Sequence, residues 1–327
     1  PGAAAAAALL AFNVLFGQRI FGAKNWISIG PLSLQPSELV KIAFILAGAA
    51  TLDRLFAKRN LIFTVLFSAY CVGCLALMSD FGTALVFFVA FLCIAFLRTG
   101  DLPSIVMMTA AAGFAGGLML HFKPYIADRF TVWRHAWEFA QSTGYQQTRT
   151  MSAVASGGLF GAGPTDAWLK YVGAANTDLV FGVVSEEFGL LLALCAVAAI
   201  ILIAVFAITS AATARSSFYT IASCAAAAML TVQVTLNTLG SVDLLPLTGV
   251  TFPFVSMGGS SLLSCWSLMA FPKAADTRQN ASFALRLPKR RPKTKPEPPK
   301  AKPSNGFFDE IPDIPVDEIF GKEDKPE

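Results

Sequence analysis

The chain has 327 residues, of which 55% are hydrophobic and only 14% are charged. Its mean hydropathy of +0.59 excludes a soluble globular protein and indicates an integral membrane protein. The formal net charge of +4 does not indicate nucleic-acid binding, because in a membrane protein the placement of the charges matters more than their sum.

Long apolar runs recur along the chain and predict an all-α fold, a polytopic transmembrane bundle of about eight helices. Residues 21–38 separate the first two runs and read as a turn-rich loop that ends in a helix start at Pro36. The expected helices cover residues 3–16, 36–52, 61–78, 82–97, 102–120, 179–207, 218–236 and 254–271.

Basic residues gather in every second connector, for example Arg98, Arg215 and Lys273. The positive-inside bias places these connectors in the cytoplasm and the others outside. We therefore predict a multi-pass protein of the cytoplasmic membrane with a transmembrane domain, residues 1–273, that includes a large extracytoplasmic loop, residues 121–176. Residues 274–327 are rich in Pro and charge and predict a disordered cytoplasmic tail whose basic part faces anionic lipid.

Two charged residues enter the second expected helix near its outer end. Glu38 and Lys41 are three residues apart, so their side chains lie one above the other on one helix face. Charges are costly inside a membrane, and each of these two lowers the cost of the other. The spacing therefore predicts a structural ion pair.

The most polar part of the chain is residues 144–189, where glycines, amides, cations and carboxylates occur together between apolar runs. Such groups in a membrane protein favour a functional site. Three cations lie in or just before this part of the chain: Lys123, Arg129 and Arg149. Each would suit an anionic ligand, and each equally fits an anchor at the membrane interface. Aromatic residues such as Trp133 and Trp137 favour an interfacial belt. The sequence contains no Walker loop, zinc pattern or dinucleotide fingerprint.

Several motifs occur in an order that resembles the SEDS family (shape, elongation, division and sporulation). The resemblance covers residues 21 to about 271, and two preceding membrane helices of the family are missing from this chain. Asn25 stands where the family usually has Arg, and Asn176 where it usually has His. The matching motifs are Gly22-Ala23-Lys24-Asn25-Trp26, Gln35-Pro36-Ser37-Glu38, Asp80-Phe81-Gly82-Thr83, Gly144-Tyr145-Gln146, Ser156-Gly157-Gly158-Leu159-Phe160-Gly161, Asn176-Thr177-Asp178, Ser185-Glu186-Glu187-Phe188-Gly189 and Leu245-Pro246-Leu247-Thr248-Gly249 with its continuation to Ser261.

The resemblance implies a peptidoglycan glycosyltransferase that polymerises lipid II at the outer face of the cytoplasmic membrane, by inversion, together with a class B penicillin-binding protein. The family's catalytic aspartate falls on Asp178, the candidate general base. Without the resemblance, Asp178 equally fits a carboxylate at a helix N-terminus. Glu186 and Glu187 are expected to brace the bundle. The candidate substrate-binding residues are Lys41, Lys123, Arg129, Arg149, Tyr145, Gln146, Ser256 and Ser260.

The leaving diphosphate needs cations or a metal, since its charge grows as the bond breaks. Mg²⁺ or Mn²⁺ is a candidate cofactor bound with the substrate, although the sequence shows no carboxylate cluster that would hold it. Two other functions also fit the chain: a lipid II flippase, and a scaffold that recruits the transpeptidase without catalysis. A transporter places its site near the middle of the membrane, whereas the polar groups here gather at one surface, which favours the enzyme.

Overall fold

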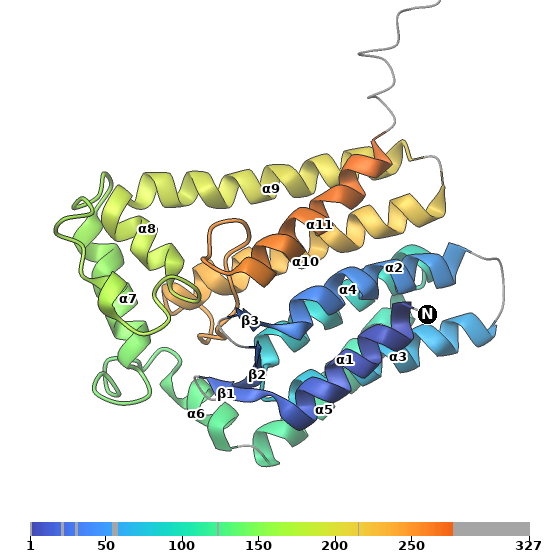
Figure 1. Cartoon of the computed structure of the whole chain (residues 1–327), viewed down its shortest axis with the longest axis horizontal. Coiled ribbons are helices and arrows are strands. Elements are labelled where there is room, and N and C mark those ends of the chain that lie inside the picture. The colour runs from blue at the N-terminus through green and yellow to red at the C-terminus, as the bar shows by residue number, and fades with distance from the viewer. Residues whose placement is uncertain are drawn as a thin grey trace, which may run out of the picture. The chain divides into compact units, whose positions relative to one another are not determined.

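The computed structural model describes residues 2–20, 23–29, 32–53, 58–122, 124–214 and 216–276. Eight long helices run back and forth and account for most of these residues (Figure 1). They are α1 (Gly2–Phe16), α2 (Pro36–Asp53), α3 (Lys58–Leu77), α4 (Phe81–Thr99), α5 (Leu102–Phe122), α9 (Leu190–Ala212), α10 (Ser217–Ser241) and α11 (Gly259–Ala275). The predicted tail lies outside the described residues beyond Asp276.

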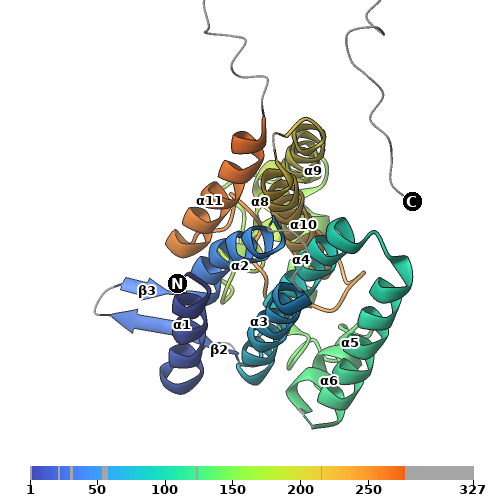
Figure 2. The same cartoon turned by 90° about the vertical axis from the view of Figure 1, so that its right-hand side faces the viewer.

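Helix α10 is at the centre of the bundle. It packs against α9, α4, α11 and α2, and buried residues line most of its length. Figure 2 looks along the bundle and shows α10 between α9 and α4. By length and hydropathy, α4, α9 and α10 are each able to cross a membrane, and α1 and parts of α3 and α5 are shorter apolar helices.

The remaining elements gather at one end of the long helices, which we call the loop end (Figure 1). Helices α6 (Pro124–Val132), α7 (Tyr145–Gly157) and α8 (Val180–Phe188) lie there, with a 3₁₀ turn at Leu169–Tyr171. The α4–α5 and α9–α10 connections and the end of α11 lie at the opposite end, where Arg98 and Lys273 are found. The predicted long loop thus has helices of its own.

A small antiparallel sheet replaces part of the turn-rich loop that the sequence predicted. Strand β2 (Ala23–Ile29) pairs with β1 (Gln18–Ile20) and β3 (Leu32–Leu34) in the order β1-β2-β3. The prediction was wrong here because strands of three to seven residues are too short for an alternating pattern to stand out. Lys24 Nζ binds the carbonyls of Val14 and Leu15, which caps the end of α1.

The single helix predicted over residues 179–207 is also wrong, because the chain breaks between α8 and α9 at Gly189. Gly189 has a φ of +91°, and a Cβ there would lie 2.3 Å from the carbonyl oxygen of Leu159. The backbone of residues 158–161 packs against the break, where Leu190 N donates to Gly158 O. A continuous apolar run hides such a break, since only the glycine marks it.

The first turn of α2 contains a buried ion pair. Lys41 Nζ lies 2.8 Å from Glu38 Oε1, and both side chains are almost completely buried. The second carboxylate oxygen, Glu38 Oε2, has no hydrogen-bond partner in the structure. The pair has the i,i+3 spacing that the sequence predicted, and it lies at the start of α2.

Replacing Lys41 with Met should therefore destabilise the protein by about 3 kcal/mol or more, because it leaves the Glu38 carboxylate buried without a cation. Thermal unfolding in detergent measures the loss. The double variant Glu38→Gln/Lys41→Met is the control, and it should recover much of the stability, since neither charge then remains buried. Equal stability of Lys41→Met and the parent would show that the pair contributes nothing.

Candidate functional site

Asp178 lies at the loop end, in the tight turn that leads into α8. Ala174 adopts a left-handed backbone conformation, with a φ of +64°. Its carbonyl oxygen accepts hydrogen bonds from the backbone N–H groups of Thr177, Asp178 and Leu179. The turn thus fixes the backbone that carries the Asp178 side chain.

Two segments that are distant in the sequence bind this turn through hydrogen bonds. Asn237 of α10 donates from Nδ2 to the carbonyl oxygens of both Asp178 and Val250, each at 2.8 Å. Ser256 Oγ binds the carbonyl of Thr177, and Met257 N donates to Asn176 O. The turn before α8 is therefore fastened to α10 and to the loop before α11.

The Asp178 side chain faces Gly249 in that loop. A Cβ at Gly249 would lie 3.1 Å from Asp178 Oδ2, and the φ of Gly249 is +70°. Only glycine takes this backbone conformation without strain and leaves room for the carboxylate. The loop and the carboxylate are therefore fitted to each other.

Asp178 has a pKa raised to about 7, chiefly because burial removes much of the hydration of its carboxylate. The Asp80 carboxylate also raises the pKa, whereas a hydrogen bond from Thr177 and the positive charge of Arg129 lower it. The side chain keeps some solvent exposure. Asp178 is thus a reachable carboxylate that changes its charge near neutral pH.

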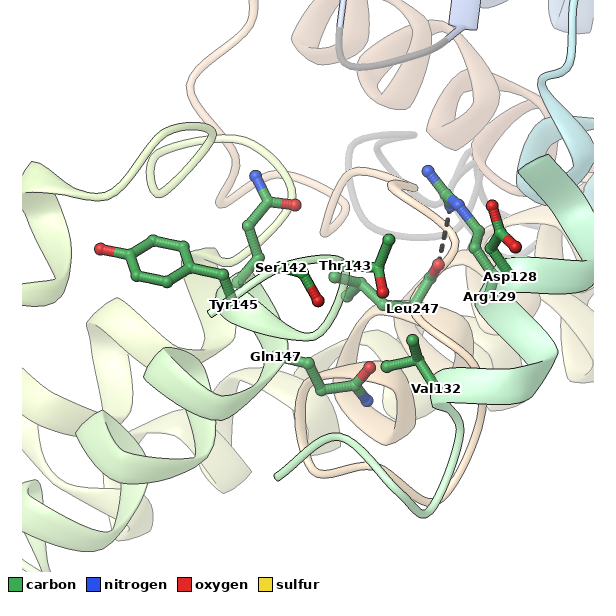
Figure 3. Close-up of a pocket in the computed structure, with 9 residues that line it drawn as sticks. Asp128, Arg129, Val132, Ser142, Thr143, Tyr145, Gln147 and Leu247 are labelled. Carbon is green, nitrogen blue, oxygen red and sulfur yellow. Dashed lines mark hydrogen bonds between the residues drawn. The ribbon is translucent and has the colours of Figure 1, made fainter. Parts of the chain in front are cut away.

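A pocket of about 290 Å³ with mostly polar lining residues is lined in part by Leu247, two residues before Gly249. Figure 3 shows Asp128, Arg129 and Val132 on one side of Leu247, and Tyr145 extending away on the other. The lining combines hydroxyl, amide, carboxylate and guanidinium groups, which are the partners of a hydroxylated or amide-bearing ligand. It consists of Asp128, Arg129, Val132, Ser142, Thr143, Tyr145, Gln146, Gln147 and Leu247.

The walls of the pocket are held together by hydrogen bonds to the loop after α10. Arg129 Nη1 donates to Leu247 O at 2.7 Å, and Trp133 Nε1 donates to Leu244 O at 3.2 Å. Gln147 Nε2 binds Gly240 O and Asp243 Oδ1, at 2.8 and 3.0 Å. The 240–247 segment thus joins the pocket to the loop that faces Asp178.

The structure brings together three of the predicted substrate-binding residues, since Arg129, Tyr145 and Gln146 all line the pocket. Arg149 lies close by, with its guanidinium 5.2 Å from the centre of the Tyr145 ring. Lys123 lies outside the described residues.

The other candidates have contacts within the protein or lie elsewhere. Ser256 Oγ bonds to Thr177 O and Phe252 N and so positions the turn of Asp178. Lys41 is engaged by Glu38, and Ser260 is buried in the first turn of α11. None of these three lines the pocket.

Glu186 supports the loop between α7 and α8. Its carboxylate accepts hydrogen bonds from the backbone N–H groups of Trp168 and Leu169, at 3.1 and 2.9 Å. Its carbonyl oxygen accepts from Ala162 N. A buried carboxylate with these partners fixes residues 162–169, which is a structural role.

Sequence reasoning did not single out three residues that shape the site: Asp80, Asn237 and Gly249. Asp80 belongs to one of the matching motifs and also has the capping signal of an Asp just before a helix, but neither predicts its effect on Asp178. Nothing in the sequence around Asn237 or Gly249 tells which distant segment each one meets. Within the described ranges, no group of three or more His, Cys, Asp or Glu residues is arranged to hold a metal ion.

Comparison with known proteins gives the family. The model of the FtsW/RodA/SpoVE cell cycle proteins matches residues 4–280. The chain belongs to the FtsW/RodA/SpoVE family. This confirms the resemblance that the motifs indicated and the all-α fold of a membrane protein.

The chain is similar to family members in sequence and to solved structures in fold. A probable peptidoglycan glycosyltransferase FtsW of Coxiella burnetii is 31% identical over 83% of this chain and 76% of its own length. A chain from a peptidoglycan synthase complex that coordinates polymerization and crosslinking superposes with a TM-score of 0.68, at 26% identity, over 86% of this chain and 81% of that one. The crystal structure of Thermus thermophilus RodA gives a TM-score of 0.60 at 26% identity, over 86% and 77%.

Gly249→Ala should impair the glycosyltransferase activity for which these relatives are named by roughly tenfold or more, because the new Cβ displaces the Asp178 carboxylate. Gly163→Ala is a matched control, since Gly163 also has a positive φ, +89°, but has open space around its Cβ position. Both variants should lose similar thermal stability through backbone strain. Equal activity losses in the two variants would contradict the fit between Gly249 and Asp178.

Proposed function

We propose that this protein is a peptidoglycan glycosyltransferase that polymerises lipid II into glycan strands, with Asp178 as its general base. One observation carries the proposal: at the loop end, a reachable carboxylate with a pKa of about 7 faces Gly249, two residues from Leu247 of a pocket lined mostly by polar residues. The names of its FtsW relatives support the same activity.

The reaction requires a base at the acceptor. A hydroxyl oxygen of the acceptor sugar attacks the anomeric carbon of the donor, a new C–O bond forms, and the bond to the lipid diphosphate breaks. Asp178 takes the hydroxyl proton during the attack. A base with a pKa near 7 is ionised in useful amounts at neutral pH and still binds a proton well, which an ordinary aspartate does not. Attack opposite the leaving diphosphate inverts the anomeric centre.

The pocket supplies contacts for the rest of the substrate. Arg129 brings a positive charge to the side of the pocket near Leu247, where a phosphate or a developing negative charge would be stabilised. Arg149 and Lys123 remain candidates for the same role. Mg²⁺ or Mn²⁺ would be held mainly by the substrate diphosphate, because the described residues offer no ligand cluster.

Orientation and partner follow from the same proposal. The loop end faces outward, and the opposite end, with Arg98 and Lys273, faces the cytoplasm, in agreement with the positive-inside bias. Similarity to a chain of a peptidoglycan synthase complex supports a partner that cross-links the new strands, which we infer is a class B penicillin-binding protein.

The two rival functions, flippase and scaffold, place different demands on Asp178. A flippase must bind and move a lipid headgroup, and a scaffold must bind its partner; neither needs a proton acceptor. A transporter site is also expected near the middle of the bundle, whereas Asp178 and the pocket lie at one end. Asp178 is therefore the residue that separates the three functions.

Asp178→Asn should lower polymerisation of labelled lipid II by roughly two to four powers of ten, while the protein stays folded and bound to the transpeptidase. The change keeps the shape of the side chain and removes the proton acceptor. Asp166→Asn is the control, since Asp166 is an exposed carboxylate of the same loop between α7 and α8 that does not line the pocket, and it should polymerise like the parent. Near-parental polymer from Asp178→Asn would refute the role of base and favour the flippase or the scaffold.

A further inference from the structure

Asp80 is another buried carboxylate at the loop end, and the proposed chemistry gives it no role. It stands between α3 and α4 as the N-cap of α4, where its Oδ1 accepts a hydrogen bond from Thr83 N at 3.2 Å. The residue is only 5% exposed. A cap by itself would be served as well by Ser or Asn, so the cap does not explain a buried charge.

The other contacts of Asp80 come from two more elements. Asn25 of β2 donates from Nδ2 to Asp80 Oδ2 at 2.8 Å, and Gln35, just before α2, donates from Nε2 at 3.4 Å. All three partners are uncharged N–H groups, which donate hydrogen bonds to the carboxylate but bring no positive charge to it. In the described part of the chain, no lysine or arginine forms an ion pair with Asp80. Its negative charge is therefore held in place without being neutralised.

The start of α4, two residues after Asp80, and the Asp178 side chain both meet one short segment, Thr248–Val250. A Cβ at Gly82, two residues after Asp80, would lie 2.3 Å from Val250 Cγ2 and 2.9 Å from Thr248 Cβ. A Cβ at Gly249 would lie 3.1 Å from Asp178 Oδ2. The start of α4 and the Asp178 carboxylate thus both pack tightly against one three-residue segment.

We propose that Asp80 is a positioning residue for catalysis: its carboxylate, held by Asn25, Gln35 and Thr83 at the start of α4, acts through its charge on the Asp178 carboxylate, which faces the same Thr248–Val250 segment that the start of α4 packs against. The inference rests on the proposed glycosyltransferase function.

The charges around Asp178 agree with this role. Asp80, at the start of α4, raises the pKa of Asp178, and Arg129, on α6, lowers it. A like charge disfavours ionisation of a nearby carboxylate, and the burial of Asp80 weakens the screening of its charge by solvent. Burial therefore raises the pKa of Asp178 most, and the opposing charges of Asp80 and Arg129 adjust the pH at which the base becomes available.

The test is the pH profile of lipid II polymerisation by the full chain with its transpeptidase partner. For the parent, the rate should rise with pH around 7, as Asp178 loses its proton. Asp80→Asn and Asp80→Ser keep an N-cap for α4 and remove the charge. Each should move the midpoint of this rise to lower pH by roughly half a pH unit or more.

A third variant neutralises the charge of Asp80 without replacing Asp80. Asn25→Arg leaves Asp80 in place and puts a guanidinium where the Asn25 amide now lies 2.8 Å from Asp80 Oδ2. The ion pair neutralises Asp80, so the midpoint should again move to lower pH. Combining it with Asp80→Asn should lower the midpoint further, because the guanidinium then has no carboxylate partner and its positive charge favours ionised Asp178. Asp166→Asn is the control and should leave the midpoint unchanged.

The outcomes separate the two proposals. If the parent makes no polymer, the proposed function is wrong. If the parent polymerises but the Asp80 and Asn25 variants lose activity equally at all pH values, Asp80 has a structural role and the inference is overturned. Failure of both Asp80→Asn and Asp80→Ser to fold would overturn it in the same way, whereas a lowered midpoint supports it.

Discussion

The site depends on one side chain that joins two distant parts of the chain. Asn237 of α10 donates to the carbonyl of Asp178 and to that of Val250, and so fastens the turn before α8 to the loop before α11. Buried carbonyl groups need such partners, and an amide is able to give both of its N–H groups at once. Because α10 is also the central helix of the bundle, the position of the carboxylate is tied to the packing of the whole core.

That position also controls the chemistry. A carboxylate fully in water would be ionised throughout the neutral range and would bind a proton weakly, whereas one fully buried would be out of reach of a substrate. The turn at Ala174 and the closely packed Gly249 place Asp178 between these extremes. Basicity here comes mainly from lost hydration, and the nearby charges of Asp80 and Arg129 adjust it.

The membrane class, most helices, the Glu38–Lys41 spacing and the candidate base could be predicted from the sequence, because apolar runs, i,i+3 spacing and ordered motifs are local signals. The sequence did not predict the β-sheet, because its strands are too short to show an alternating pattern, or the break at Gly189, because a single glycine stands within a long apolar run. The pocket was only partly foreseen: Arg129, Tyr145 and Gln146 were named, but the role of Leu247 arises from a hydrogen bond that spans 118 residues. Contacts of that kind are set by packing, which one sequence does not show.

The most direct test of the account is to titrate Asp178 itself. Protein labelled with ¹³C at the aspartate carboxyl groups would be followed by NMR from pH 4 to pH 9, and the Asp178 signal would be identified by its loss in Asp178→Asn. The account predicts a midpoint near 7, since the surroundings of this carboxylate favour its neutral form. A midpoint near 4, the value of a freely hydrated aspartate, would contradict it, because the structure would then give Asp178 no more basicity than a surface residue.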